Sequence, residues 1–198
     1  MKIKICGLFQ SEDIDYVNEA KPDYIGFVFA KSKRQVDLNQ AQLLKARLDS
    51  QIKTVGVFVD SSIERIVELV DKKIIDIIQL HGHENDLYIR ELKKYINVPI
   101  IKAIKVNQAG DLDNLDYDVN YYLLDNKISG SGESFDWSVI KDLNKPFFLA
   151  GGIDLNNIEK AIQIRCFGLD VSSGAETNGI KDRNKIIEIV RRVKNDDR

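Results

Sequence analysis

Two turns rich in glycine and serine near the C-terminus contain the residues whose chemistry is easiest to interpret. Gly151 and Gly152 form one turn, Ser172 and Ser173 form the other, and each pair directly follows a short apolar run. Backbone N–H groups in such turns bind phosphate without a metal ion, and glycine lets the anion approach closely. We therefore predict a phosphate site made by these four residues.

The elements that position these turns are short apolar runs that alternate with helical patterns. The runs are almost continuously hydrophobic, which indicates strands buried on both faces, as in a parallel sheet. Eight strands in this alternation predict an α/β fold, a single (β/α)8 TIM barrel domain over residues 1–198. The predicted strands are Lys2–Cys6, Tyr24–Phe29, Thr54–Val59, Ile75–Leu80, Ile100–Ile104, Tyr121–Asp125, Phe147–Ala150 and Phe167–Val171.

The helical patterns between the strands vary in strength. Apolar spacing predicts helices over residues 63–70 and 87–95, and Asp60 or Ser61 offers an N-cap to the first of them. The connection over residues 107–116 has few apolar residues and contains a glycine, so we expect a short or distorted helix there. Phe135 and Trp137 are expected to seat the sixth helix.

In a TIM barrel the active site lies at the C-terminal ends of the strands. Polar side chains gather at these predicted ends, namely Cys6, Arg34, His81, Asp125 and Asp170. Each has an alternative structural interpretation when taken alone. A cysteine can be a small core residue, an aspartate can cap a turn, and an arginine can be a solvated loop charge.

The charge and hydropathy of the chain argue against two classes of partner. Lys and Arg number 29 and Asp and Glu number 31, so no basic face for nucleic acid is predicted. The longest apolar stretches, such as Tyr24–Ala30, are far shorter than the roughly 20 residues that span a bilayer. Lys2 and Lys4 interrupt the N-terminus before a signal-type apolar segment can form.

Cys6 and Cys166 are the only two cysteines. If Cys6 ends the first strand and Cys166 begins the last, neighbouring strands hold them about 13 Å apart, at about 3.3 Å per residue. That separation is beyond the reach of a disulfide. We expect two free thiols and a cytoplasmic protein.

Seven motifs in order, each at a strand end, resemble those of the phosphoribosylanthranilate isomerase family. The resemblance runs from residue 2 to about residue 190. The motifs are Lys4–Leu8, Gly26–Phe29 with Ser32 and Arg34, Gln79–Gly82, Leu124–Asp125, Phe135–Trp137, Leu149–Gly152 and Asp170–Glu176.

This resemblance implies an aldose-ketose isomerase of tryptophan biosynthesis. Its reaction is an Amadori rearrangement of N-(5-phosphoribosyl)anthranilate to 1-(2-carboxyphenylamino)-1-deoxyribulose 5-phosphate. One acid opens the furanose ring and one base removes the proton from the adjacent sugar carbon. The resemblance implies no cofactor, no metal and no obligatory protein partner, only a small phosphosugar substrate.

The resemblance also assigns roles to individual residues. Cys6 matches the general base, and neighbouring cations or N–H dipoles can lower the pKa of a thiol toward neutrality. Asp125 matches the general acid, which must be protonated to act. Arg34 is expected to bind the anthranilate carboxylate through its guanidinium fork. Asp170 matches a substrate-contacting carboxylate, with bracing of the following loop as a competing role.

Two positions depart from the family pattern. Phe9 stands where the family usually has threonine or serine, and Ser129–Gly132 replaces a Gly-Gly-Thr-Gly sequence. Neither change involves the matched acid or base. His81 is interpreted as a hydrogen-bonded structural residue and is left out of catalysis.

The sequence leaves three alternative functions to be weighed against this one. A histidine-pathway sugar isomerase of the same fold would require an aspartate in place of Cys6. A ribulose-phosphate epimerase would require metal-binding histidines and carboxylates on several strands, and this chain has two histidines. A phosphosugar-binding barrel without catalysis would need neither Cys6 nor Asp125.

Overall fold

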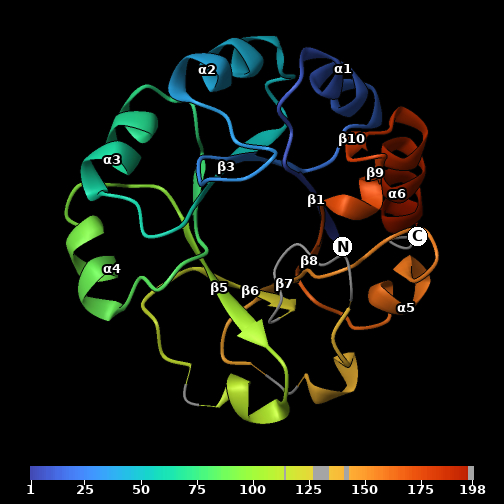
Figure 1. Ribbon diagram of the computed structural model, residues 1–198. Helices are drawn as coiled ribbons and strands as arrows, with labels where there is room; N and C mark the ends of the chain where they lie inside the picture. The colour runs from blue at the N-terminus through green and yellow to red at the C-terminus, as the bar shows by residue number, and fades with distance from the viewer. Residues whose placement is uncertain (114, 127–133, 141–142, 196–198) are drawn as a thin grey trace.

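Eight parallel strands close into a barrel in the computed structural model, which describes the chain apart from residues 114, 127–133, 141–142 and 196–198 (Figure 1). The strands follow one another around the barrel in chain order, and the last pairs with the first. This confirms the predicted (β/α)8 fold. The strands are β1 (Lys2–Cys6), β2 (Tyr24–Val28), β3 (Lys53–Phe58), β4 (Ile77–Leu80), β5 (Ile100–Val106), β6 (Tyr121–Asn126), β7 (Phe147–Leu149) and β8 (Gly168–Val171).

Helices form a ring outside the barrel (Figure 1). The α-helices are α1 (Ser11–Ala20), α2 (Leu38–Arg47), α3 (Ile63–Asp71), α4 (Asp86–Leu92), α5 (Ile158–Ile162) and α6 (Arg183–Asn195). The described residues also form three single turns of 3-10 helix, η1 (Ala109–Leu112), η2 (Trp137–Val139) and η3 (Ser173–Ala175). A small antiparallel hairpin of β9 (Glu176–Thr177) and β10 (Ile180–Lys181) precedes α6.

Two details of the predicted helices were wrong. The N-cap of α3 is Ser62, whose hydroxyl accepts the N–H of Arg65, because Asp60 instead adopts a left-handed backbone and binds the N–H of His83. The described part of the sixth connection contains η2 in place of the expected α-helix. Ile140 already has extended backbone angles there, so the turn ends after three residues. The expected short helix after β5 is confirmed as η1.

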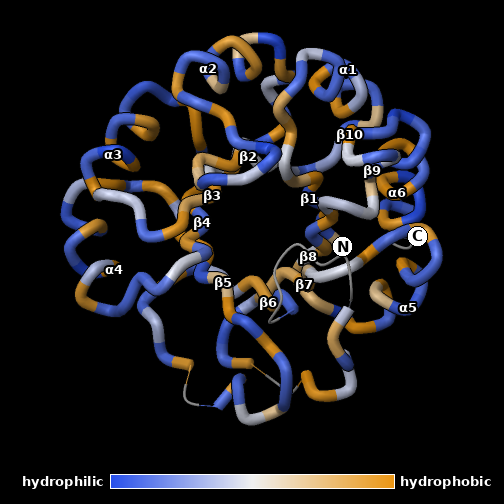
Figure 2. Tube along the Cα trace, viewed as in Figure 1, coloured by the Kyte–Doolittle hydropathy of each residue, from blue (hydrophilic) through white to orange (hydrophobic). Residues whose placement is uncertain are grey.

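The barrel interior is filled by apolar side chains below its mouth. One apolar cluster lies inside the barrel and includes Val55, Ile101 and Leu123, whereas a larger one lies between strands and helices. The ring of Phe148 contacts those of Tyr121 and Phe167, with centroids 5.8 and 5.2 Å apart. Figure 2 shows the same division, with hydrophobic positions along the strands and hydrophilic ones on the outer helix surfaces.

Strand register brings polar residues together at the C-terminal half of the interior. Lys4 on β1 is the register partner of Asp170 on β8, and Cys6 follows Lys4 on the same face of β1. Gln79 occupies the corresponding face of β4. Because side chains alternate between faces, these residues point into the barrel and the apolar neighbours between them point outward to the helices.

Two further findings concern the described part of the chain as a whole. No helix in it is long and apolar enough to cross a membrane. Cys6 and Cys166 are both free and buried, as the sequence predicted.

Candidate active site

A cavity of about 330 Å³ opens at the C-terminal ends of the strands. All eight residues predicted from the sequence to form the site line this one cavity. They are Cys6, Arg34, Asp125, Gly151, Gly152, Asp170, Ser172 and Ser173. The segment Ser129–Gly132, which departs from the family pattern, lies outside the described residues.

The thiol of Cys6 is held in a tight space at the end of β1. Its register partner on β2 is Gly26, where a Cβ atom would lie 2.6 Å from the Cys6 sulfur, so glycine makes room for the thiol. Burial raises the pKa of Cys6, and the cations Lys4 and Lys181 offset this only in part. The pKa of Cys6 therefore lies above its ordinary value, whereas neighbouring cations alone would lower it.

Asp170 forms a buried ion pair with Lys4. The Lys4 ammonium donates to both carboxylate oxygens of Asp170 at 3.0 Å, and the two side chains are 0% and 8% exposed. Burial lowers the pKa of Lys4, but the adjacent Asp170 carboxylate more than offsets this and the pKa lies above its ordinary value. Lys4 is therefore a permanent ammonium beneath Cys6, and Asp170 provides its counter-charge.

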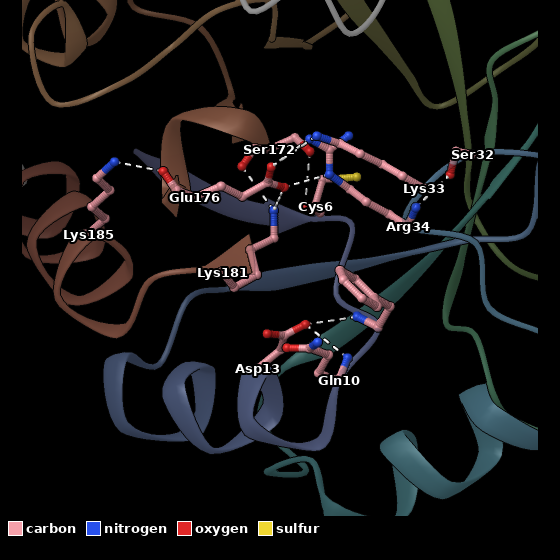
Figure 3. A network of polar contacts seen from close by, with 11 residues as sticks. Cys6, Gln10, Asp13, Ser32, Lys33, Arg34, Ser172, Glu176, Lys181 and Lys185 are labelled. Carbon is pink, nitrogen blue, oxygen red and sulfur yellow. Dashed lines mark hydrogen bonds and ion pairs between the residues drawn. The ribbon is translucent and has the colours of Figure 1, made fainter. Parts of the chain in front are cut away.

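The guanidinium group of Arg34 is already engaged along one edge. Its Nε and Nη2 atoms donate to the two carboxylate oxygens of Glu176 at 2.5 and 2.8 Å (Figure 3). A guanidinium presents two edges for forked hydrogen bonds, and this pairing leaves the Nη1 edge unused by Glu176. Arg34 lines the cavity, so that second edge is the one available to a carboxylate there.

Glu176 also connects Arg34 with a buried lysine (Figure 3). The ammonium of Lys181 donates to a carboxylate oxygen of Glu176 at 2.8 Å and to the carbonyl oxygen of Ser172 at 2.9 Å. Burial lowers the pKa of Lys181, and the Glu176 carboxylate opposes that change. Glu176 and Lys181 belong to the β9–β10 hairpin, so this hairpin connects Arg34 with the loop that follows β8.

Asp125 contacts His81 at the opposite side of the cavity. The Nε2 atom of His81 lies 3.2 Å from Oδ2 of Asp125, and Oδ1 of Asp125 accepts the N–H of Asn126 at 2.9 Å. Both side chains are mostly buried, with exposures of 17% for His81 and 13% for Asp125. The sequence analysis interpreted His81 as a structural residue and left it out of catalysis, and the structure places it against the predicted acid.

The predicted phosphate loops lie next to each other after β7 and β8. Gly151 and Gly152 have φ angles of +84° and +63°, which favour glycine. Gly174 touches the first loop, because a Cβ at this position would lie 2.0 Å from the carbonyl oxygen of Ile153. Ser173 begins η3, where the first N–H groups have no partner within the helix.

The second loop is separated from α6 by η3 and the β9–β10 hairpin. The hydroxyl of Ser172 donates to the carbonyl oxygen of Cys6 at 3.2 Å, which ties the loop to the end of β1. Backbone groups and Ser173 are therefore the donors that this loop can offer an anion.

Four residues of the site were not assigned by the sequence analysis: Lys4, Gln79, Glu176 and Lys181. Lys4 and Gln79 each lie two residues before a polar strand end, at positions that should be apolar in a barrel core. That signal could have identified both of them. Glu176 and Lys181 belong to a loop, and no periodic pattern distinguishes them from surface charges.

Comparison with known proteins identifies the family. Residues 3–192 match the family described as N-(5'phosphoribosyl)anthranilate (PRA) isomerase. N-(5'-phosphoribosyl)anthranilate isomerase of Endomicrobium trichonymphae is 47% identical over 195 residues, covering 96% of each chain.

Two solved structures give the same result. Phosphoribosyl anthranilate isomerase of Thermotoga maritima superimposes with a TM-score of 0.90 at 34% identity, covering 98% of this chain and 99% of that one. Another phosphoribosyl anthranilate isomerase, solved in complex with reduced 1-(o-carboxyphenylamino)-1-deoxyribulose 5-phosphate, has a TM-score of 0.83 at 30% identity, with coverage of 98% and 99%. The chain belongs to the N-(5'-phosphoribosyl)anthranilate isomerase family.

Proposed function

We propose that this chain isomerises N-(5'-phosphoribosyl)anthranilate, with Cys6 as general base and Asp125 as general acid. The observation that supports this assignment is that both side chains line one cavity together with Arg34 and the two loops suited to phosphate. A relative that is 30% identical binds the reduced form of the product, which carries the carboxylate and the phosphate that these groups would recognise.

The reaction needs one proton donated and one removed. Asp125 protonates the furanose ring oxygen, and the C1–O bond breaks as the anilino nitrogen lone pair forms a C=N bond. The thiolate of Cys6 then removes the proton from C2. The C–H electron pair forms a C1=C2 bond while the C=N π electrons return to nitrogen, and the resulting enol tautomerises to the ketone.

The two anionic ends of the substrate have separate partners in this proposal. Backbone N–H groups of Gly151, Gly152, Ser172 and Ser173 bind the phosphate. The edge of Arg34 that faces away from Glu176 binds the anthranilate carboxylate. Asp170 reaches the same cavity and contacts a sugar hydroxyl or the amine, in addition to holding Lys4.

The physiological setting follows from the family. We propose that the chain acts in tryptophan biosynthesis on a small phosphosugar and works in the cytoplasm. The two free thiols support a reducing compartment.

The test uses substrate generated in situ, with loss of its anthranilate-type fluorescence as the signal. Cys6→Ala and Asp125→Asn should each lower kcat by about 100-fold or more, the range for removing a general acid or base, with little change in KM. Cys166→Ala is the matched control, because this second buried thiol lies outside the cavity, and it should retain turnover. Near-normal turnover in the Cys6 or Asp125 variant would remove that residue from the mechanism.

A further inference from the structure

Five polar side chains form a continuous chain of contacts across the barrel beneath its mouth. Asp170 pairs with Lys4 at 3.0 Å, and the Lys4 ammonium donates to Oε1 of Gln79 at 2.9 Å. Nε2 of Gln79 lies 2.9 Å from Nδ1 of His81, and Nε2 of His81 lies 3.2 Å from Oδ2 of Asp125. The chain thus starts at β8 beside the predicted base and ends at the predicted acid.

The hydrogen bonds in this chain have one direction. An ammonium group has donors only, so the Gln79 atom that faces Lys4 must be the carbonyl oxygen. The amide nitrogen of Gln79 then faces His81 and can only donate, which makes Nδ1 of His81 the acceptor. A hydrogen on Nδ1 would point at the amide hydrogens of Gln79, so two donors would face each other with no acceptor between them. A neutral His81 that accepts this bond carries its hydrogen on Nε2, the ring nitrogen that lies 3.2 Å from Oδ2 of Asp125.

We propose that His81 is a positioning residue for Asp125, and that Lys4 and Gln79 set its tautomer. This inference rests on the proposed role of Asp125 as the general acid. Nε2 of His81 lies 3.2 Å from Oδ2 of Asp125, and Oδ1 accepts the N–H of Asn126, so both oxygens of the carboxyl group have a protein neighbour that limits its orientation. The carboxyl group is thereby held in one orientation at the cavity wall before substrate binds.

The burial of the chain supports a role beyond stability. Lys4 is 0% exposed and Gln79 is 1% exposed, inside a barrel that is filled by apolar side chains below its mouth. Burying an amide and an ammonium is costly even when both are hydrogen-bonded, and apolar side chains of similar volume would serve a core equally well. The Lys4 ammonium and the Gln79 amide nitrogen both face acceptors, which is the arrangement that rigidifies a buried network.

The first experiment measures the tautomer directly by nitrogen-15 NMR of histidine-labelled protein. The chain has only two histidines, and the exposed His83 gives an internal reference. We expect His81 to be protonated on Nε2 and unprotonated on Nδ1 at neutral pH. In Gln79→Glu a carboxylate faces Nδ1, and we expect a ring protonated on both nitrogens. A wild-type His81 protonated on Nδ1 would overturn the proposal.

The second experiment separates positioning from structure through kinetics. His81→Leu removes the donor to Asp125 and should lower kcat by up to about 100-fold with KM changed by less than about threefold, since a misplaced group costs rate more than binding. His81→Gln places an amide N–H near the former Nε2 and should recover most of kcat. His83→Leu is the matched control and should behave as wild type, because His83 is 86% exposed and contacts Asp60 on the surface.

The outcomes distinguish this inference from the proposed function. Full turnover in His81→Leu, or equal loss in His81→Leu and His81→Gln, would overturn the positioning role while isomerase activity of the wild type stands. A wild-type protein without isomerase activity would overturn the proposed function, and the positioning role with it.

Discussion

Replacing Glu176 with glutamine would remove one charge from a buried cluster while keeping the shape of the side chain. The carboxylate is 4% exposed and receives hydrogen bonds from Arg34 at 2.5 and 2.8 Å and from Lys181 at 2.8 Å. Burial raises the pKa of Glu176, but Arg34 and Lys181 more than offset this and the pKa lies below its ordinary value. The variant leaves Lys181, which is 0% exposed, without its counter-charge.

The expected effect on stability follows from this burial. Removing one partner of a buried ion pair costs about 3–5 kcal/mol, and the glutamine carbonyl retains one acceptor, so we expect about 3 kcal/mol. For a protein of this size 1 kcal/mol corresponds to about 2–4 °C, so Tm should fall by about 6–12 °C. Arg34 also loses its anchor, and KM should rise about tenfold, equal to about 1.4 kcal/mol.

Thermal unfolding followed by circular dichroism, together with the fluorescence assay, tests both effects. Because the pKa of Glu176 is lowered by folding, its stabilisation is present above about pH 4.3 and is lost as pH falls through the lower, folded-state value. The difference in Tm between wild type and Glu176→Gln should therefore narrow in acid.

Glu19→Gln is the matched control for this prediction. Glu19 also pairs with an arginine, Arg183, but both side chains are about half exposed, at 48% and 50%. An exposed pair contributes little to stability, so Tm and KM should hardly change in the control. Equal shifts in the two variants, or an unchanged KM in Glu176→Gln, would refute the assignment of Glu176 as the anchor of Arg34.

Two further predictions concern the base and the phosphate site. Because burial raises the pKa of Cys6 above its ordinary value, alkylation of Cys6 by iodoacetamide should still accelerate with pH at about pH 9, and a rate that levels off below about pH 8.5 would contradict the raised pKa. Ser173→Asp puts a negative charge in the predicted phosphate loop and should raise both KM and the inhibition constant of inorganic phosphate at least tenfold, whereas the neutral Ser173→Asn should change them much less. Similar constants in the two variants would place the phosphate elsewhere.

The strands and the residues at their ends could be read from the sequence, because both depend on local patterns. Eight apolar runs predicted eight strands whose observed ends differ by at most two residues from those expected. Parallel strands of a barrel present their C-terminal ends on one face, so polar residues at those ends had to converge. This is why Cys6, Arg34, Asp125 and Asp170 were placed in one site from the sequence alone.

Only the tertiary structure decided which of these groups touch. The contact between Lys4 and Gln79 joins residues 75 positions apart, and the pair of Arg34 and Glu176 joins residues 142 positions apart. Such contacts depend on barrel closure and on strand register, neither of which leaves a periodic signal along the chain. From the sequence alone, a histidine at a strand end is therefore interpreted as a structural residue. Only closure of the barrel shows that His81 lies against Asp125.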